Sequence, residues 1–337
     1  MAHREFWKNK RVLITGFEGF LGSNLARTLV LYGAKMSGVD IRVNRAHTIF
    51  SPGDYRRINV VKGDVANYKL LKELIAKNRI QVVFHLAAEA LVGNAYRHPL
   101  RAFKSNIRGT WNILEACRQA GTVEAIIVAS SDKVYGSHKK LPYTEDYFLN
   151  GKHPYDVSKS CADLLATSYS QSYGLPVLVT RSGNIYGPGD FNFSRLIPDA
   201  MRCIAYAKTL KIRSDGNFIR DYIYVDDVVS AYLSIAELFK RQALSGKALN
   251  LSDESPLTVM DLLHKIRMIA SRGSQLKYTI LNTAKHEIKE QYLSSKRART
   301  ILGWKPRYTI EHGLQKTIAW YDDYFNNLNS KARYERK

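Results

Sequence analysis

An acid and an amine stand side by side in the segment Ser130-Ser-Asp-Lys-Val-Tyr-Gly136, immediately after an apolar run. That run, residues 125–129, has the unbroken apolar pattern of a parallel strand buried on both faces. A surface ion pair needs no such position, whereas a proton-transfer site at the end of a strand does. We therefore expect Asp132 and Lys133 to take part in proton transfer, with a local ion pair in a loop as the alternative.

A second candidate pair lies in Tyr155-Asp-Val-Ser-Lys159, where the four-residue spacing places both side chains on one face of a helix. A tyrosine, whose ordinary pKa is about 10, is a poor base near neutral pH. A nearby ammonium and an oxidised nicotinamide ring both favour the phenolate and make such a tyrosine a better base. This spacing alone is common on helices, and it gains weight from a glycine-rich segment near the N-terminus.

That segment is Thr15-Gly-Phe-Glu-Gly-Phe-Leu-Gly22, which follows the first apolar run and begins a helical pattern. Its G-x-x-G-x-x-G spacing is a variant of the dinucleotide fingerprint, in which glycines permit a sharp turn and close backbone approach to a pyrophosphate. The N-terminus of the helix then favours the phosphate charge. We expect the cofactor to be bound by Gly16, Glu18, Gly19, Phe20, Leu21 and Gly22.

Three further segments are predicted to border the cofactor. Asp40 ends the second strand, where a carboxylate would accept hydrogen bonds from ribose hydroxyls and repel a 2′-phosphate. It therefore favours NAD over NADP, although the nearby Arg42 leaves NADP open. Asp64 follows the third strand and would lie by the adenine, or it is a simple turn residue. The remaining candidates are Val65 beside it and the small-residue segment after the fourth strand, Leu86, Ala87 and Ala88.

Strand-like runs and helical patterns alternate along the first half of the chain, and these elements must position the candidate residues. The runs cover residues 11–14, 36–39, 57–61, 81–86, 125–129 and 177–180, and the helical patterns cover 21–31, 68–77, 100–119 and 155–173. This alternation predicts an α/β fold, a Rossmann-like doubly wound parallel sheet that binds ligands at the carboxyl ends of its strands.

Beyond about residue 185 the pattern is less regular and richer in turn residues. We expect a smaller, discontinuous C-terminal substrate-binding domain there. Residues 1–185 and 218–250 are assigned to the NAD-binding Rossmann domain, 186–217 and 251–326 to the smaller domain, and 327–337 to a basic tail.

Composition narrows the possible classes of protein. The three cysteines, Cys117, Cys161 and Cys203, are widely spaced and odd in number, which disfavours a disulfide framework or a zinc site and fits a reducing cytoplasm. No apolar run is long enough to cross a membrane. The net charge of +21 suits an anionic substrate or a basic surface, and no nucleic-acid-binding motif accompanies it. We expect a cytoplasmic protein without a metal site, a membrane anchor or a nucleic-acid partner.

Together, the glycine loop, Asp40, Ser131 and Tyr155-x-x-x-Lys159 resemble the extended short-chain dehydrogenases/reductases that modify nucleotide sugars, from Lys10 to about Tyr324. The resemblance implies NAD as cofactor, with Ser131, Tyr155 and Lys159 at the hydride-transfer site. It also implies a nucleotide-sugar substrate and a homodimer or homotetramer.

The two residues after Ser131 separate the activities of this family. In its 4-epimerases these positions are usually small or apolar, whereas in its 4,6-dehydratases they form an ionisable pair. Asp132 and Lys133 therefore imply a lyase that oxidises C4 of a hexose, eliminates water across C5 and C6, and returns the hydride to C6. Lys133 would take the C5 proton, and Asp132 would protonate the departing C6 hydroxyl. The alternatives are a 4-epimerase and a non-catalytic NAD-binding or nucleic-acid-associated protein.

Several other stretches resemble CDP-glucose 4,6-dehydratases, among them residues 85–92, 181–187, 189–198, 220–227 and 286–293. They imply that CDP-glucose is converted to CDP-4-keto-6-deoxyglucose. Glu89 stands where glutamine is common, and the loop 136–143 is short, so GDP-, UDP- and dTDP-sugars stay open. An arginine fork suits a diphosphate, more so for Arg220 than for Arg195, which equally suits the surface. The implied substrate-binding residues are Asn184, Asn192, Arg195, Leu196, Arg213, Arg220, His286 and Tyr292.

Overall fold

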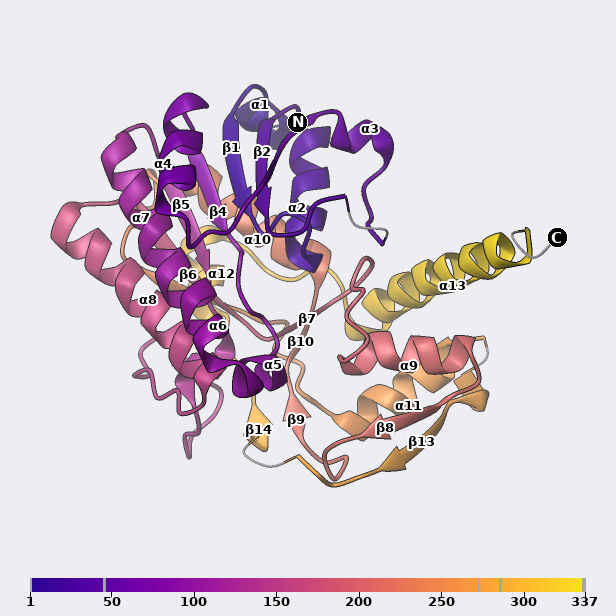
Figure 1. The fold of residues 1–337 in the computed structure, drawn as a ribbon. Coiled ribbons are helices and arrows are strands. Elements are labelled where there is room, and N and C mark those ends of the chain that lie inside the picture. Colours follow the sequence, from indigo (N-terminus) through magenta and orange to yellow (C-terminus); the bar gives the residue numbers. More distant parts are fainter. Residues whose placement is uncertain (1, 45–46, 272, 285–286, 335–337) are drawn as a thin grey trace.

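The computed structural model describes residues 2–44, 47–271, 273–284 and 287–334 (Figure 1). Its largest sheet has seven strands in the order β11-β6-β5-β4-β1-β2-β3, and every pair in it is parallel. This confirms the predicted α/β, doubly wound Rossmann-like class. The strands are β1 (Arg11–Thr15), β2 (Lys35–Asp40), β3 (Ile58–Lys62), β4 (Val82–His85), β5 (Ala125–Ala129), β6 (Val177–Ser182) and β11 (Ala248–Leu251).

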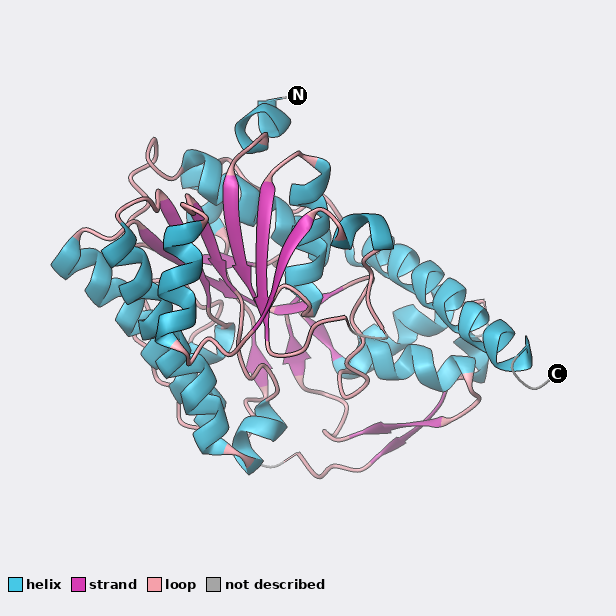
Figure 2. Cartoon of the chain, turned by 45° about the horizontal axis from the view of Figure 1, so that its top comes forward, coloured by secondary structure: helices cyan, strands magenta, loops and turns pink. Residues whose placement is uncertain are grey.

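Helices cover both faces of this sheet because successive strand residues point to opposite sides. Val12 and Ile14 pack in the cluster that contains α2 and α10, whereas Leu13 packs in the cluster that contains α4, α7 and α8. Figure 2 shows the strands between these two helical layers. The helices are α2 (Phe20–Leu31), α4 (Tyr68–Lys77), α7 (Gly109–Ala120), α8 (Pro154–Tyr173) and α10 (Val225–Leu238), with the short α1 (Ala2–Trp7), α3 (Pro52–Tyr55), α5 (Val92–Arg97) and α6 (Pro99–Phe103) at the periphery.

The helix predicted over 100–119 is confirmed, but it contains a π-helical turn that the sequence did not predict. The chain forms α6, then a π-helical turn over Lys104–Arg108, and then α7. A π turn contains one extra residue, so it rotates the side chains before it relative to those after it. Here it turns Asn106 into the buried interior next to the active-site helix.

A second hydrophobic cluster holds the smaller region together, which lies beyond the carboxyl ends of the sheet strands (Figure 1). It packs α9 (Leu196–Ala205), α11 (Val259–Ile269) and α13 (Ile310–Tyr334). The accompanying short strands are β7 (Asn184–Tyr186) with β10 (Tyr222–Tyr224), β8 (Thr209–Ile212) with β13 (Lys277–Ile280), and β9 (Ile219–Arg220) between β12 (Leu257–Thr258) and β14 (Glu290–Gln291). The single-turn helix η3 spans Gly273–Gln275.

The predicted domain division stays a prediction, and two segments of the structure bear on it. After the smaller region the chain returns to the Rossmann core at α12 (Lys296–Leu302), where Ala298 and Trp304 join the cluster of α2 and α10 and the Trp304 indole donates to Ser230 at 2.9 Å. In addition, α13 continues to Tyr334, so most of the predicted basic tail prolongs this helix. None of the described helices is long and apolar enough to span a membrane.

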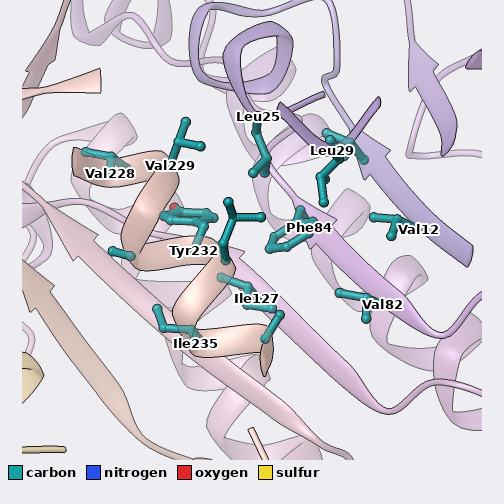
Figure 3. Packing of buried hydrophobic residues seen from close by; sticks show 14 of the residues in the cluster. Val12, Leu25, Leu29, Val82, Phe84, Ile127, Val228, Val229, Tyr232 and Ile235 are labelled. Atoms are coloured by element: carbon teal, nitrogen blue, oxygen red, sulfur yellow. The ribbon is translucent and has the colours of Figure 1, made fainter. Parts of the chain in front are cut away.

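Phe84 lies at the centre of the sheet's packing against α2 and α10 (Figure 3). Its ring stacks on Tyr232, with centroids 6.1 Å apart, and it is fully buried. We expect Phe84→Ala to lower the free energy of unfolding by about 3–5 kcal/mol, because the lost contacts leave a cavity. Urea unfolding measures this change, and Phe148→Ala is the matched control because Phe148 is 71% exposed. Equal losses in the two variants would contradict this description of the core.

Candidate active site

The glycine loop is a tight turn whose backbone leaves no room for side chains at two positions. Gly16 has a φ of 73°, and a Cβ on it would lie 2.8 Å from the backbone nitrogen of Ala87. A Cβ on Gly22 would overlap the carbonyl oxygen of Gly16. This turn starts α2 at the carboxyl edge of the sheet, where its first N–H groups favour a phosphate. The loop thus fits the pyrophosphate of a dinucleotide.

Asp40 lies beside this loop, as the sequence predicts. It ends β2 with 6% exposure, and its carboxylate accepts hydrogen bonds from the backbone N–H groups of Glu18 at 3.2 Å and Arg42 at 3.1 Å. Glu18 accepts in turn from the backbone N–H of Asn44 at 2.9 Å. These bonds hold a carboxylate at the position where ribose hydroxyls are recognised in Rossmann folds.

The residues after β3 have partners within the protein. One Asp64 oxygen accepts from the backbone N–H of Ala66 at 2.8 Å, and the other lies 3.0 Å from the Lys104 ammonium. Val65 is buried against Gly109 at the start of α7. The contacts of Asp64 are those of a turn residue with an ion pair, and its place by the adenine stays a prediction.

Tyr155, Lys159 and Ser131 converge from two elements. Tyr155 and Lys159 lie one turn apart in α8, and Ser131 follows β5 and is hydrogen-bonded to the Tyr155 hydroxyl. The Lys159 ammonium donates to the carbonyl of Ala129 at 2.7 Å. This bond ties the active-site helix to the end of β5 and brings together residues separated by about 30 positions in the sequence.

Burial shifts the protonation of both side chains of α8. Burial lowers the pKa of Lys159 to about 8 and raises the pKa of Tyr155 to about 12, and the contact between Tyr155 and Ser131 opposes the rise. The protein alone therefore keeps the tyrosine neutral. A cation bound beside it, such as an oxidised nicotinamide, would favour the phenolate.

Asp132 and Lys133 extend this group of residues. They begin the short helix η2 (Asp132–Tyr135), which Ser131 caps. One Asp132 oxygen accepts from the Ser131 hydroxyl at 2.9 Å and lies 3.2 Å from the Lys133 ammonium. Asp132 is 1% exposed, and its other oxygen has no hydrogen-bond partner among the described residues. A buried oxygen left in this way is costly to the fold and is suited to a ligand.

Asp156 is a candidate that the sequence analysis missed. It lies between Tyr155 and Lys159, is buried, and shares the electrostatic environment of Lys133. Burial raises its pKa, and the charge of Lys133 opposes that rise. The sequence could have indicated this residue, because Asp156 is the third residue of α8. An acid at that position accepts a hydrogen bond from the backbone N–H of the N-cap residue, here His153.

A cleft of about 490 Å³ adjoins these residues. The wall formed by residues 136–156 includes Asp156, and the opposite wall is residues 287–290 before Tyr292. Its lining carries charges of both signs, including Lys152 and Glu287. Among the candidate active-site residues, Asp156 is the one that lines this cleft.

Several of the predicted substrate-binding residues have partners within the protein. The Arg220 guanidinium donates to the carbonyls of Ile219 at 2.9 Å and Lys289 at 3.0 Å, and Arg195 pairs with Asp190 at 2.9 Å. The carbonyl of Tyr292 accepts from Tyr143, and the side chain of Asn192 accepts from Ser194.

The other predicted substrate-binding residues lie in the smaller region or next to it. Asn184 begins β7, Leu196 begins α9, and Arg213 is exposed after β8. His286 lies outside the described residues. The roles of this whole group in substrate binding stay predictions.

His85, at the end of β4, is a buried polar residue that the sequence analysis placed in a family-like stretch without a role. Its imidazole lies 2.8 Å from the Thr15 hydroxyl and 3.1 Å from the Thr110 hydroxyl. Burial and the charge of Lys159 lower its pKa from 6.5 to about 3. Within the described part of the chain, no cluster of three or more His, Cys, Asp or Glu side chains could hold a metal ion.

Comparison with known proteins places the chain among enzymes that modify nucleotide sugars. Residues 13–317 match the family described as GDP-mannose 4,6 dehydratase. The chain is 30% identical to the CDP-glucose 4,6-dehydratase of Salmonella typhimurium over 95% of its length and 93% of that protein. It is also 30% identical to the UDP-glucuronate 4-epimerase of Thermodesulfobacterium geofontis, over 91% of its length and 95% of that protein.

A solved structure agrees in fold and contains a cofactor. The dTDP-glucose 4,6-dehydratase of Bacillus anthracis in complex with NAD has a TM-score of 0.81 and 27% identity to this chain, covering 93% of this chain and 97% of that one. Dehydratases and epimerases are thus similar to this chain to about the same degree.

The buried histidine makes stability depend on pH. Since the His85 pKa falls from 6.5 to about 3 on folding, the unfolded chain binds this proton more readily than the native protein below pH 6.5. Its contribution to the free energy of unfolding should therefore drop by about 2 kcal/mol between about pH 7 and pH 5. Urea unfolding of the wild type and of His85→Gln at both pH values isolates this contribution. Two parallel pH curves would contradict it.

Proposed function

Because the chain belongs to the GDP-mannose 4,6 dehydratase family, we propose that it is an NAD-dependent nucleotide-hexose 4,6-dehydratase. The observation that carries the proposal is the Asp132–Lys133 ion pair, which touches Ser131 and so lies next to Tyr155. Oxidation and reduction at C4 require only the serine, tyrosine and lysine. Elimination of water needs one further base and one further acid, and this pair supplies both.

The residues present fit NAD. The glycine loop would hold its pyrophosphate, Asp40 its adenosine ribose and Lys159 its nicotinamide ribose. When bound, NAD accepts a hydride from C4 and later gives it to C6. The proposal is supported by the NAD in the Bacillus anthracis dehydratase structure.

The side chains of this chain then move the protons. Tyr155 takes the proton of the C4 hydroxyl, and the resulting ketone acidifies the hydrogen on C5. Lys133 takes that proton, Asp132 protonates the departing C6 hydroxyl, and water leaves. After C6 is reduced, Lys133 returns its proton to C5. Tyr155 has then gained one proton and Asp132 has lost one, so a transfer between them restores the enzyme.

The ion pair reaches its reactive form by a single proton transfer. In the ion pair the proton to be transferred is on the Lys133 ammonium. The elimination requires it on the Asp132 carboxyl group, with Lys133 as the neutral amine. The 3.2 Å contact between the Lys133 ammonium and the Asp132 carboxylate provides the path. A substrate that excludes water favours this transfer, because a neutral pair costs less to bury than two charges.

CDP-glucose is the substrate we propose, with CDP-4-keto-6-deoxyglucose as the product. Support comes from the stretches resembling CDP-glucose 4,6-dehydratases and from the similarity to the Salmonella typhimurium enzyme. The second candidate function is a 4-epimerase, which the equal identity to a UDP-glucuronate 4-epimerase favours. In that case Asp132 and Lys133 would be polar loop residues without a chemical step.

Mass spectrometry after incubation with NAD and, separately, CDP-, dTDP-, UDP- and GDP-glucose tests the activity and the substrate together. We expect the loss of one water from CDP-glucose alone. Loss of water from another nucleotide sugar would keep the dehydratase and change the nucleotide. An unchanged mass with a new sugar configuration by NMR would establish the epimerase instead.

Substitution of Lys133 by methionine tests the assigned base. Lys133→Met should abolish the loss of water while the absorbance of reduced nicotinamide still rises after CDP-glucose is added, because oxidation at C4 does not use this side chain. Lys140→Met is the matched control, since Lys140 is exposed in the loop after η2, and it should dehydrate at the wild-type rate. Normal dehydration by Lys133→Met would remove Lys133 from the mechanism.

A further inference from the structure

The imidazole of His85 bridges two parts of the candidate active site. It is buried at the end of β4, between Thr15, which ends β1, and Thr110 in α7. Thr15 precedes the glycine loop, and Thr110 follows the π turn that carries Asn106. The three residues come from sequence positions up to 95 apart, so only the fold brings them together.

The hydrogen bonds of the neighbours fix which nitrogen of His85 carries the proton. The Thr110 hydroxyl donates its only hydrogen to the carbonyl of Asn106 at 2.6 Å, so it accepts from His85 Nε2. Nδ1 is then the lone-pair nitrogen, and the Thr15 hydroxyl donates to it. A neutral histidine with one donor and one acceptor at opposite ends satisfies both contacts.

At one end, this chain of hydrogen bonds holds the backbone that faces the glycine loop. The Thr15 oxygen accepts from the backbone N–H of Ala87 at 3.2 Å. The backbone nitrogen of Ala87 also lies only 2.8 Å from the position of a Cβ on Gly16. The bond to His85 therefore sets the separation between the glycine loop and the segment after β4.

At the other end, the same chain reaches the helix of Tyr155. The Asn106 amide donates to the Ser158 hydroxyl at 2.8 Å, and Ser158 donates to the carbonyl of Tyr155 at 2.7 Å. Asn106 also accepts from the backbone N–H of Glu89 at 2.7 Å. Every polar hydrogen of the side chains in this sequence of contacts is donated, so a change at one end disturbs the hydrogen bonds toward the other.

We propose that His85 is a positioning residue that couples the cofactor-binding glycine loop to the helix bearing Tyr155 and Lys159. Its neutral, Nε2-protonated imidazole transmits the position of one to the other. The inference rests on the NAD-dependent hydride transfer of the proposed function and not on the elimination step. It therefore holds for a dehydratase and for an epimerase alike.

A charged imidazole would break this arrangement. Protonated Nδ1 would point a hydrogen at the Thr15 hydroxyl, whose own hydrogen would lose its acceptor. The added charge would also face Lys159, the cation that opposes the charging of His85. The charges of Asp132 and Asp156 act on Tyr155, and the causes of the His85 pKa shift are burial and Lys159 rather than either carboxylate.

NMR of the wild-type protein with ¹⁵N-labelled histidine tests the tautomer without any sugar substrate. We expect the His85 resonances of a neutral, Nε2-protonated ring at both neutral and mildly acidic pH. His85→Gln assigns those resonances by their disappearance. A protonated ring or an Nδ1-protonated ring in the wild type would overturn the proposal.

A double-mutant cycle with NAD as the probe tests the coupling. Thr15→Val and Thr110→Val each remove one contact of His85, and each should weaken NAD binding by roughly tenfold, the effect of one lost hydrogen bond. The double variant should bind NAD about as weakly as either single variant, because breaking one end already disengages the imidazole. The proposal would be overturned if the loss of NAD affinity in the double variant equalled the product of the two single losses. It would also be overturned if Thr110→Val left the NAD affinity unchanged.

Two further variants guard this result against misfolding. Thr15→Ser and Thr110→Ser keep the hydroxyls and should restore the wild-type NAD affinity. Thr317→Val is the matched control, because Thr317 is also a buried helical threonine that donates to the carbonyl four residues before it, at 2.7 Å in α13. It should leave NAD affinity unchanged. A loss of affinity equal to that of Thr110→Val would show a general effect of such substitutions and overturn the coupling.

Discussion

The active site depends on the close approach of two backbone segments, the turn at Gly16 and the segment at Ala87. They meet where the strand order of the sheet reverses. From β1 the chain continues to β2 and β3 on one side of the sheet, whereas β4, β5 and β6 follow one another on the other side. Crossover connections diverge at such a point and leave a crevice at the carboxyl edge of the sheet. Any side chain on Gly16 would push the two segments apart. The crevice in turn sets where Asp40, Ser131 and α8 can meet a dinucleotide.

Buried charge distinguishes this crevice from a general binding site. Lys159 and Asp132 are both nearly inaccessible to solvent, and each is held by backbone or neighbouring side-chain contacts. In such an environment a bound cation strongly affects the protonation of Tyr155. The Asp132–Lys133 ion pair lies at the edge of the same buried group. The proposed oxidation, elimination and reduction would therefore use one set of side chains without large rearrangement.

The sequence was sufficient for elements whose signal is local. Apolar runs, the glycine spacing and Tyr155-x-x-x-Lys159 predicted the strands, the cofactor loop and the active-site helix. The structure departs from these expectations where the signal is long-range. Residues 100–119 contain no proline and no glycine before Gly109, yet the helix is interrupted by a π turn that buries Asn106. The contacts of His85 with Thr15 and Thr110, and the return of α12 to the Rossmann core, join positions far apart in sequence and follow only from the fold.

The most direct test of the account follows the hydride itself. CDP-glucose carrying deuterium at C4 is incubated with the protein and NAD in ordinary water, and the product is examined by mass spectrometry and NMR. The account predicts a product that has lost one water and carries the deuterium on the C6 methyl group, since the hydride removed from C4 returns to C6 of the same molecule. A sugar of unchanged mass with the deuterium still at C4 and an altered configuration there would contradict it.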